Sequence, residues 1–160
     1  MLYKSLILFF FVIYSTTTSA IEQQLATNWC WAASVQDVVA QAGHYESQPQ
    51  VAARLTGWPQ NRPAYIPEVV ALVQSYGLRA WQVGYPGTPQ QLYNTLSTGW
   101  KIIAFVKPTN GPVGHYIVLE GIDSNGNIIA GNPATGLTMA YTLNQIYYAW
   151  RWGDSVIVGR

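Results

Sequence analysis

The sequence has almost no cysteine, because Cys30 is the only one among 160 residues. An internal disulfide is therefore excluded, although exported proteins with several cysteines usually pair them. One cysteine and two separated histidines, His44 and His115, provide no ligand set for a metal ion, so we expect no metal and no cofactor. A lone thiol is either a small buried apolar side chain or a chemical group in use, and its local setting has to distinguish the two.

Charged residues are also scarce, at 9% of the chain, with eight basic and seven acidic side chains. No basic patch is present that could neutralise phosphates, so we predict no nucleic-acid partner. Aromatic residues are plentiful instead, and all seven tryptophans lie beyond residue 20. They favour a core rich in large side chains, with an aromatic groove for peptide or glycan as the alternative interpretation.

Long hydrophobic runs are missing too. The longest, Leu6 to Tyr14, has nine residues, whereas a membrane-spanning helix needs about 20. Lys4 precedes this run, and a short run of small residues ending at Ala20 follows it. This order predicts a secretory signal peptide over residues 1–20, cleaved after Ala20, and one domain over residues 21–160. We therefore expect a secreted or periplasmic protein without stable membrane insertion after cleavage; an uncleaved membrane anchor is the alternative.

Hydrophobic periodicity changes along the chain. Helical spacing and turn signals predict a first helix capped by Thr27 or Asn28 and ended by Gly43. Further helices are expected at about 48–56, 66–76 and 88–97, with a short helical turn at 142–148. Strands are expected at 79–85, 101–107, 115–122, 127–131, 137–141 and 154–158. Helices that mostly precede antiparallel strands indicate an α+β fold.

Cys30 lies in the first turn of the first expected helix. Unpaired backbone N–H groups and the positive end of the helix dipole favour a thiolate at this position. A neighbouring histidine would activate the thiol further and then protonate the leaving group. His44 follows the far end of the same helix, about 20 Å away, and is expected on the surface. His115 begins a strand and is therefore the candidate acid–base partner of Cys30.

Such a pair also needs a group that orients the second imidazole nitrogen. Asn132, which ends the strand expected to pair with the His115 strand, is the candidate, and Asp123 at the hairpin turn is a poorer one. A two-residue loop at 125–126 would place Asn132 opposite Leu119, about 13 Å along the strand from His115. Asn132 comes within reach of His115 if the register shifts so that it lies opposite Ile117. The triad therefore requires an irregular hairpin or a bend near Asn132.

An acyl-transfer site further needs donors to a developing oxyanion. The backbone N–H of Cys30 can provide one. The side-chain amide of Gln24, six residues earlier, can provide the second, and the adjacent Gln23 is not excluded.

These four residues, in the order Gln24, Cys30-Trp31, Gly114-His115 and Gly131-Asn132-Pro133, resemble the papain-like cysteine peptidases. The similarity is greatest to their compact bacterial branch, which includes bacteriocin-leader peptidase domains and secreted effector proteases. It implies a papain-like fold, with the nucleophile helix packed on a C-terminal antiparallel sheet. It also implies Cys30 as nucleophile, His115 as acid–base, Asn132 as orienting residue and Gln24 as oxyanion donor.

The spacing departs from that of full-size papains. His115 and Asn132 follow Cys30 by 85 and 102 residues, whereas about 130–150 separate the corresponding papain residues. We therefore expect a compact, monomeric hydrolase that acts on a peptide or protein substrate. Two alternatives remain at this point. One is a cell-wall amide or isopeptide hydrolase, or an acyl transferase, with the same triad. The other is a catalytically silent papain-like binding module.

Overall fold

The helices differ in whether the local sequence supplies their N-terminal caps. A computed structural model describes residues 20–84, 87–107 and 114–160, so the expected signal peptide, apart from Ala20, lies outside the described residues. The helices are α1 (Cys30–Gln41), α2 (Gln48–Thr56), α3 (Ile66–Gln74), α4 (Pro89–Ser97) and the π-helical turn η1 (Gln145–Ala149). In α4, the Thr88 hydroxyl accepts a hydrogen bond from the Gln91 backbone, and Gln91 Oε1 accepts one from the Thr88 backbone. This reciprocal capping explains why the sequence predicted the start of α4 correctly.

The start of α1 differs from the prediction. Its N-cap is Trp29, not Thr27 or Asn28, and no side chain caps it. The two expected caps bond elsewhere, because Asn61 Nδ2 donates to Thr27 Oγ1 and the Asn28 backbone donates to Asn61 Oδ1. A tertiary contact with a distant loop has therefore replaced the local cap.

The strands form one antiparallel sheet in the order β1-β6-β2-β3-β4-β5. Their bounds are β1 (Arg79–Val83), β2 (Lys101–Val106), β3 (His115–Ile122), β4 (Ile128–Asn132), β5 (Leu137–Tyr141) and β6 (Asp154–Gly159). The predicted strand at 79–85 is shorter in the structure, and Tyr85 lies outside the described residues. The strand predicted at 127–131 is shifted by one residue, so Asn132 ends it as expected.

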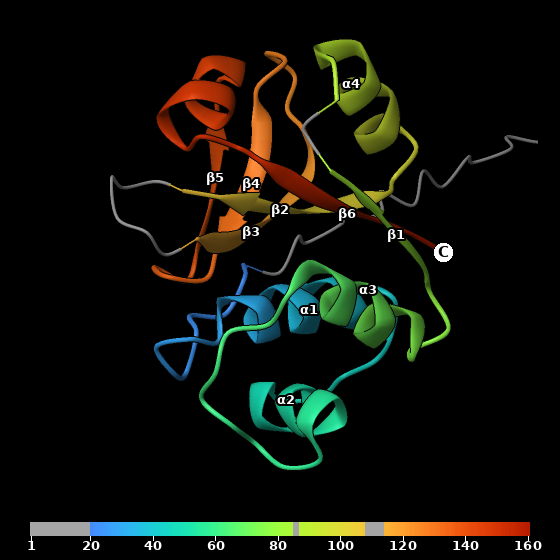
Figure 1. The fold of residues 1–160 in the computed structure, drawn as a ribbon. Coiled ribbons are helices and arrows are strands. Elements are labelled where there is room, and N and C mark those ends of the chain that lie inside the picture. Colours follow the sequence, from blue (N-terminus) through green and yellow to red (C-terminus); the bar gives the residue numbers. More distant parts are fainter. Residues whose placement is uncertain (1–19, 85–86, 108–113) are drawn as a thin grey trace, which may run out of the picture.

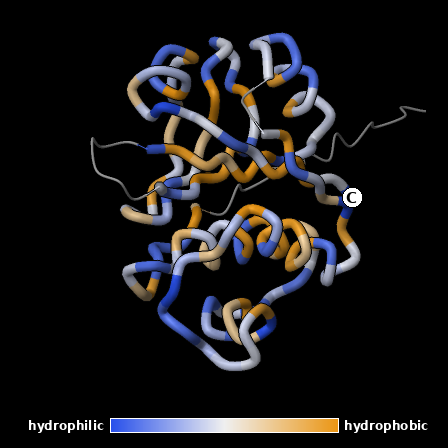
Figure 2. The backbone as a smooth tube through the Cα atoms, in the orientation of Figure 1, coloured by the Kyte–Doolittle hydropathy of each residue, from blue (hydrophilic) through white to orange (hydrophobic). Residues whose placement is uncertain are grey.

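Helices cover both faces of the sheet (Figure 1). α1 and α3 lie on one face, and α2 packs on them from the side away from the sheet. The three helices and the sheet share an apolar core that includes Val35, Val69 and Ile103. α4 and η1 lie on the other face, over a second core around Leu92, Ile117 and Ile146. Figure 2 shows the hydrophobic segments concentrated in the strands and in the helices packed against them. The N-terminal helix layer and the antiparallel sheet give the predicted α+β fold, with α1 packed chiefly on β3.

The β3–β4 hairpin is irregular in the way that the site requires. Its loop runs from Asp123 to Asn127, where the Asp123 backbone donates to the Asn127 carbonyl. A second shift occurs at Glu120, which has no partner on β4 and forms a bulge. Val118 consequently pairs with Gly131, so the next position along each strand sets Asn132 opposite Ile117.

None of the helices within the described residues is long and apolar enough to cross a membrane.

Candidate active site

Cys30 is the first residue of α1 and is partly buried. The tryptophans on either side of it fix this end of the helix. The Trp29 indole N–H donates to the Gln60 carbonyl at 2.7 Å, and the Trp31 indole N–H donates to the Arg62 carbonyl at 2.9 Å. Both indoles are buried, so these bonds satisfy donors that would otherwise lose their partners. Cys30 is thereby held between two anchored side chains.

The surroundings of the Cys30 sulfur act on its pKa in opposite directions. Burial is the largest cause and raises the pKa of the thiol. Hydrogen bonding to the backbone of Tyr116, Trp31 and Cys30 itself lowers the pKa. The backbone groups therefore act as expected for a helix start, but burial outweighs them. An isolated thiol here stays neutral near pH 7, so a nearby proton acceptor is needed to make it a nucleophile.

His115 begins β3, next in sequence to Tyr116, whose backbone bonds the Cys30 sulfur. The strand pairing sets His115 opposite Val106 on β2. Gly114, just before it, is required by packing, because a Cβ atom there would lie 1.8 Å from the ring of Phe105. Phe105 also packs on Tyr116 with ring centroids 5.1 Å apart. The Gly-His pair of the sequence thus reflects an aromatic ring lying over the backbone before the histidine.

The imidazole of His115 is joined to Asn132, with Nε2 2.8 Å from Asn132 Oδ1. The same Oδ1 accepts a bond from the Ala134 backbone N–H at 3.0 Å. A backbone N–H can only donate, so this second bond identifies the atom as the oxygen of the amide. His115 Nε2 must therefore carry the hydrogen, and in the neutral ring Nδ1 is left as the proton acceptor.

Two causes act on the pKa of His115. Burial lowers it, and the hydrogen bond with Asn132 raises it by a smaller amount, so the pKa lies below the ordinary value. The ring is therefore neutral at pH 7, with a basic Nδ1. A neutral imidazole is the state required of a group that removes a proton from a thiol.

Gln24 lies in the loop that leads to Cys30. Its backbone N–H donates to the Pro133 carbonyl at 2.8 Å, which joins this loop to the turn after Asn132. Its side-chain Nε2 donates to the carbonyls of Ala26 and Thr27, both at 2.9 Å. These two bonds use both hydrogens of the amide. Gln24 can donate to an oxyanion only by releasing one of the two carbonyls, and its role remains a prediction.

The rival candidates are engaged elsewhere. His44 is exposed after the end of α1, where its ring packs edge-on against Tyr76. Asp123 accepts bonds from the backbones of Asn125 and Asn127 and is a turn residue. Gln23 donates to the Ala134 carbonyl. His115 and Asn132 are the predicted residues that the structure joins directly.

The loop at 57–64 is the part of the site that the sequence analysis missed. It holds Trp29, Trp31 and Asn28 through the backbone of Gln60, Arg62 and Asn61. The available signal was a pair of tryptophans on either side of Cys30, because buried indoles need hydrogen-bond acceptors.

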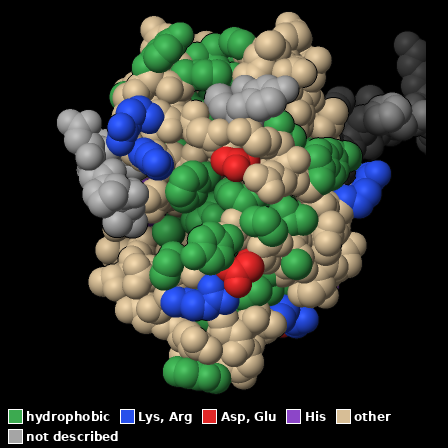
Figure 3. Space-filling view, in the orientation of Figure 1, with side chains coloured by type: hydrophobic (Ala, Val, Ile, Leu, Met, Phe, Trp, Pro, Cys, Tyr) green, Lys and Arg blue, Asp and Glu red, His purple; other side chains and the backbone are tan. Residues whose placement is uncertain are grey.

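The aromatic residues divide between core and surface. Trp29, Trp31 and Trp152 are buried, Trp100 and Trp150 are half-buried, and Trp58 and Trp81 are exposed. Hydrophobic side chains also gather across the middle of the face drawn in Figure 3. The expected aromatic-rich core is therefore present.

Among the described residues, no group of three His, Cys, Asp or Glu side chains could hold a metal ion.

Comparison with known proteins identifies the family. The sequence profile of the Peptidase_C39 like family matches residues 17–155. A search of curated proteins finds no match. Similar solved structures include the peptidase domain of Streptococcus ComA, a bi-functional ABC transporter involved in quorum sensing. It shares 16% identity and a TM-score of 0.68, over 88% of this chain and 98% of that one.

Two further structures are similar. A C39-like peptidase from Bacillus anthracis shares 14% identity and a TM-score of 0.69, over 89% of this chain and 94% of that one. A double glycine motif protease from an AMS/PCAT transporter, in complex with the leader peptide, shares 21% identity and a TM-score of 0.64. The similarity covers 89% of this chain and 94% of that one. At these identities the structures establish the papain-like fold, and the profile match over most of the chain establishes the family: the chain belongs to the Peptidase_C39 like family of papain-like cysteine peptidases.

Proposed function

We propose that the protein is an exported cysteine peptidase that hydrolyses peptide bonds with a Cys30–His115–Asn132 triad. The observation that carries this proposal is the tautomer of His115. The bond to Asn132 Oδ1 fixes the ring hydrogen on Nε2, which leaves Nδ1 as the base at the strand end that contacts Cys30. Cys30 is then the nucleophile, His115 is its base and Asn132 orients the base, which is the arrangement of a catalytic triad.

The reaction follows from these positions. Nδ1 of His115 takes the proton of the Cys30 thiol as the sulfur attacks the scissile carbonyl carbon. The imidazolium then donates this proton to the leaving amine, and an acyl group remains on the sulfur. One water molecule, deprotonated by the same nitrogen, releases the acid and restores the thiol. Asn132 keeps the ring oriented throughout, because its Oδ1 is itself held by the Ala134 N–H.

The oxyanion of each tetrahedral intermediate lies beside the start of α1. The backbone N–H of Cys30 supplies one donor there. Gln24 supplies the second after its amide exchanges one loop carbonyl for the substrate oxygen. The fixed backbone bond from Gln24 to Pro133 keeps the amide within the site during this exchange.

The substrate class that we propose is a peptide or an extended protein segment. The support is that one structurally similar protease was solved in complex with a leader peptide. We propose export because residues 1–20 have the order of a secretory signal peptide, with cleavage after Ala20. All four site residues come from one chain, so a monomer suffices for activity.

The direct test is hydrolysis of a mixed peptide library by protein that begins at Ile21. Cleavage is expected for the wild type, and the rate should fall by more than about 10³-fold in Cys30→Ala and in His115→Ala. His44→Ala is the matched control, since it removes the other, exposed histidine, and it should retain wild-type activity.

Peptidoglycan fragments provide the second arm of this experiment. Release of peptides from the library with intact peptidoglycan is the expected result. Selective cleavage of the cell-wall fragments would contradict the peptide substrate, and equal activity of His115→Ala and wild type would contradict the triad.

A further inference from the structure

A buried pair of acidic side chains lies between α1 and β3, away from Cys30. Asp37 on α1 is 8% exposed and Glu120 on β3 is 4% exposed. Burial raises the pKa of both carboxyl groups, and the charge of Glu120 adds to the rise at Asp37, whose pKa reaches about 7. Lys101 on β2 is the cation that acts on both, yet its Nζ bonds the Glu120 backbone carbonyl rather than the carboxylate.

The Glu120 carboxylate has an unused acceptor. Oε1 accepts a bond from the Thr138 hydroxyl at 3.4 Å. Oε2 is buried and has no hydrogen-bond partner among the residues that the structure describes. A buried carboxylate oxygen without a donor is costly, so this atom indicates a missing cation or donor.

The backbone nitrogen of Ile21 is linked to this carboxylate through the Thr138 hydroxyl. It donates to Thr138 Oγ1 at 3.2 Å, so Thr138 connects Ile21 to Glu120 in a continuous chain of hydrogen bonds. A Cβ atom at Gly131 would lie 2.9 Å from Glu120 Oε1 and 3.0 Å from Ile21 Cβ, which places both groups over one point of β4. The Ile21 side chain is 2% exposed, whereas Ala20 is exposed.

The segment that follows Ile21 is fixed to the candidate active site. Gln48, which is fully buried, donates to the Gln23 carbonyl at 2.9 Å and accepts from the Leu25 backbone at 2.8 Å. The backbone of Gln24 donates to Pro133, just after Asn132. Whatever fixes Ile21 therefore also fixes the loop of Gln24 against the turn of Asn132.

We propose that cleavage between Ala20 and Ile21 creates an α-ammonium group that the Glu120 carboxylate binds, and that this ion pair fixes the N-terminal segment in the active enzyme. A processing peptidase hydrolyses the Ala20–Ile21 bond with one water molecule. The C–N bond breaks, Ala20 gains a carboxylate, and the Ile21 nitrogen becomes an ammonium with three hydrogens. One hydrogen keeps the bond to Thr138, and another turns to Glu120 Oε2.

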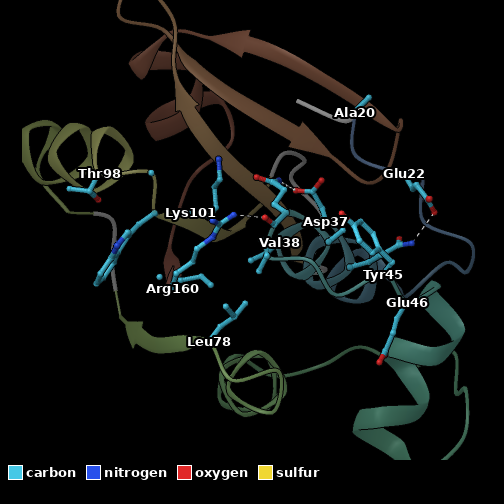
Figure 4. Close-up of a pocket in the computed structure, with 18 of the residues that line it drawn as sticks. Ala20, Glu22, Asp37, Val38, Tyr45, Glu46, Leu78, Thr98, Lys101 and Arg160 are labelled. Atoms are coloured by element: carbon cyan, nitrogen blue, oxygen red, sulfur yellow. Dashed lines mark hydrogen bonds between the residues drawn. The ribbon is translucent and has the colours of Figure 1, made fainter. Parts of the chain in front are cut away.

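The surroundings suit a cation of this kind. An ammonium bound by Glu120 supplies the donor that Oε2 lacks among the described residues. Its positive charge also opposes the repulsion that Glu120 exerts on Asp37. A cavity of about 1180 Å³, lined in part by Ala20, Asp37, Lys101 and Arg160, adjoins the Asp37 member of the pair (Figure 4). Departure of residues 1–20 leaves Ile21 in place, because its side chain is buried and its backbone is held by Thr138.

This inference rests on the proposed export and cleavage, and it is tested without reference to catalysis. Two proteins are compared, one beginning at Ile21 and one beginning at Ala20, in which the ammonium is displaced by about 3.8 Å. Each of these two proteins is prepared both with the native Glu120 and with the substitution Glu120→Gln, which gives four proteins. With Glu120, the protein that begins at Ile21 should melt about 5 °C higher at pH 7. In Glu120→Gln, the difference between the two start sites should fall below about 1 °C.

A second measurement needs no substitution. The pKa of the Ile21 α-amino group, followed by NMR with ¹⁵N-labelled isoleucine, should lie above the ordinary range of about 7.7–8.0. An ordinary pKa, equal melting temperatures for the two start sites, or a difference that persists in Glu120→Gln would each overturn the proposal. Absence of peptide hydrolysis in every form would instead refute the proposed function, and it leaves the melting and titration results unaffected.

Discussion

The elements α1 and β3 meet at two places, and the polar groups at these two places differ in their hydrogen-bond partners and in their charge. At the start of both elements, Cys30 lies beside the strand end that carries His115, and the imidazole is bonded to Asn132. Further along, Asp37 and Glu120 are both buried, and Glu120 Oε2 has no hydrogen-bond partner among the described residues. The first meeting point holds neutral groups that can exchange a proton. The second holds two buried acids whose nearby cation, Lys101, bonds the Glu120 backbone carbonyl rather than a carboxylate.

The difference shows how burial acts on each kind of group. Burial disfavours charge, so it keeps the Cys30 thiol and the His115 ring neutral. Neutral groups are compatible with a stable fold, and they allow the thiol proton to move to the imidazole during the reaction. At Asp37 and Glu120 the same effect opposes ionisation that pH 7 would otherwise impose. The acid pair therefore weakens the fold as the pH rises, because Lys101 offsets only part of the effect of burial.

The largest of these effects is expected from Asp37→Asn in protein that retains Ala20. The folded-state pKa of Asp37 is raised from 3.8 to about 7, so its contribution to stability is present below about pH 4 and is lost as the pH rises to 7. The variant should match the wild type near pH 4 and exceed it by about 3 kcal/mol at pH 8 in urea unfolding. Glu22→Gln, on the exposed N-terminal segment, is the control. A gain of the same size at both pH values would refute this interpretation.

Asn132→Ala tests the other meeting point. Without the amide oxygen, the His115 ring loses the bond that selects its tautomer, and kcat should fall by about 10²-fold with little change in KM. Asn132→Asp keeps an acceptor at the same place and should retain most of the activity. Steady-state kinetics on one peptide substrate decide the matter, and equal losses in the two variants would show that Asn132 acts only as a turn residue.

The smallest effect is expected from Gly114→Ala. The added Cβ would meet the Phe105 ring, which cannot yield without disturbing its packing on Tyr116. The free energy of unfolding should fall by about 1–2 kcal/mol, and kcat should fall with it because His115 follows directly. Gly126→Ala provides the control, since it lies in the hairpin loop far from the site and only the melting temperature should respond. Unchanged kcat in Gly114→Ala would show that His115 does not depend on this packing.

Most of the element order was accessible from the sequence, because it depends on local chemistry. Thr88 and Gln91 cap α4, Pro49 lies in the first turn of α2, and Gly57 has the positive φ that ends it. The bounds of β3 and β5 were predicted correctly as well. The papain-like α+β fold followed from this order together with the resemblance.

The features that the sequence did not give arise from contacts between distant segments. Trp29 rather than Thr27 or Asn28 caps α1, because Asn61 bonds the two predicted caps. The short turn predicted at 142–148 is the π-helical η1, one to three residues later. Glu120 gave no sign of a bulge within an otherwise regular strand, yet this bulge sets Asn132 opposite Ile117. The condition for the triad could be stated from the sequence, but the register that meets it could not.

The central claim is that His115 Nδ1 is the base that activates Cys30. Its most direct test is the rate of alkylation of Cys30 by iodoacetamide between pH 5 and pH 10, in the wild type and in His115→Ala. The thiol is the only one in the chain, so the label reports on it alone. The wild type should remain reactive at pH 6–7. In His115→Ala, reactivity should appear only above the ordinary thiol pKa of about 8.5, because burial then raises the pKa without a base nearby. Superimposable profiles for the two proteins would contradict the account.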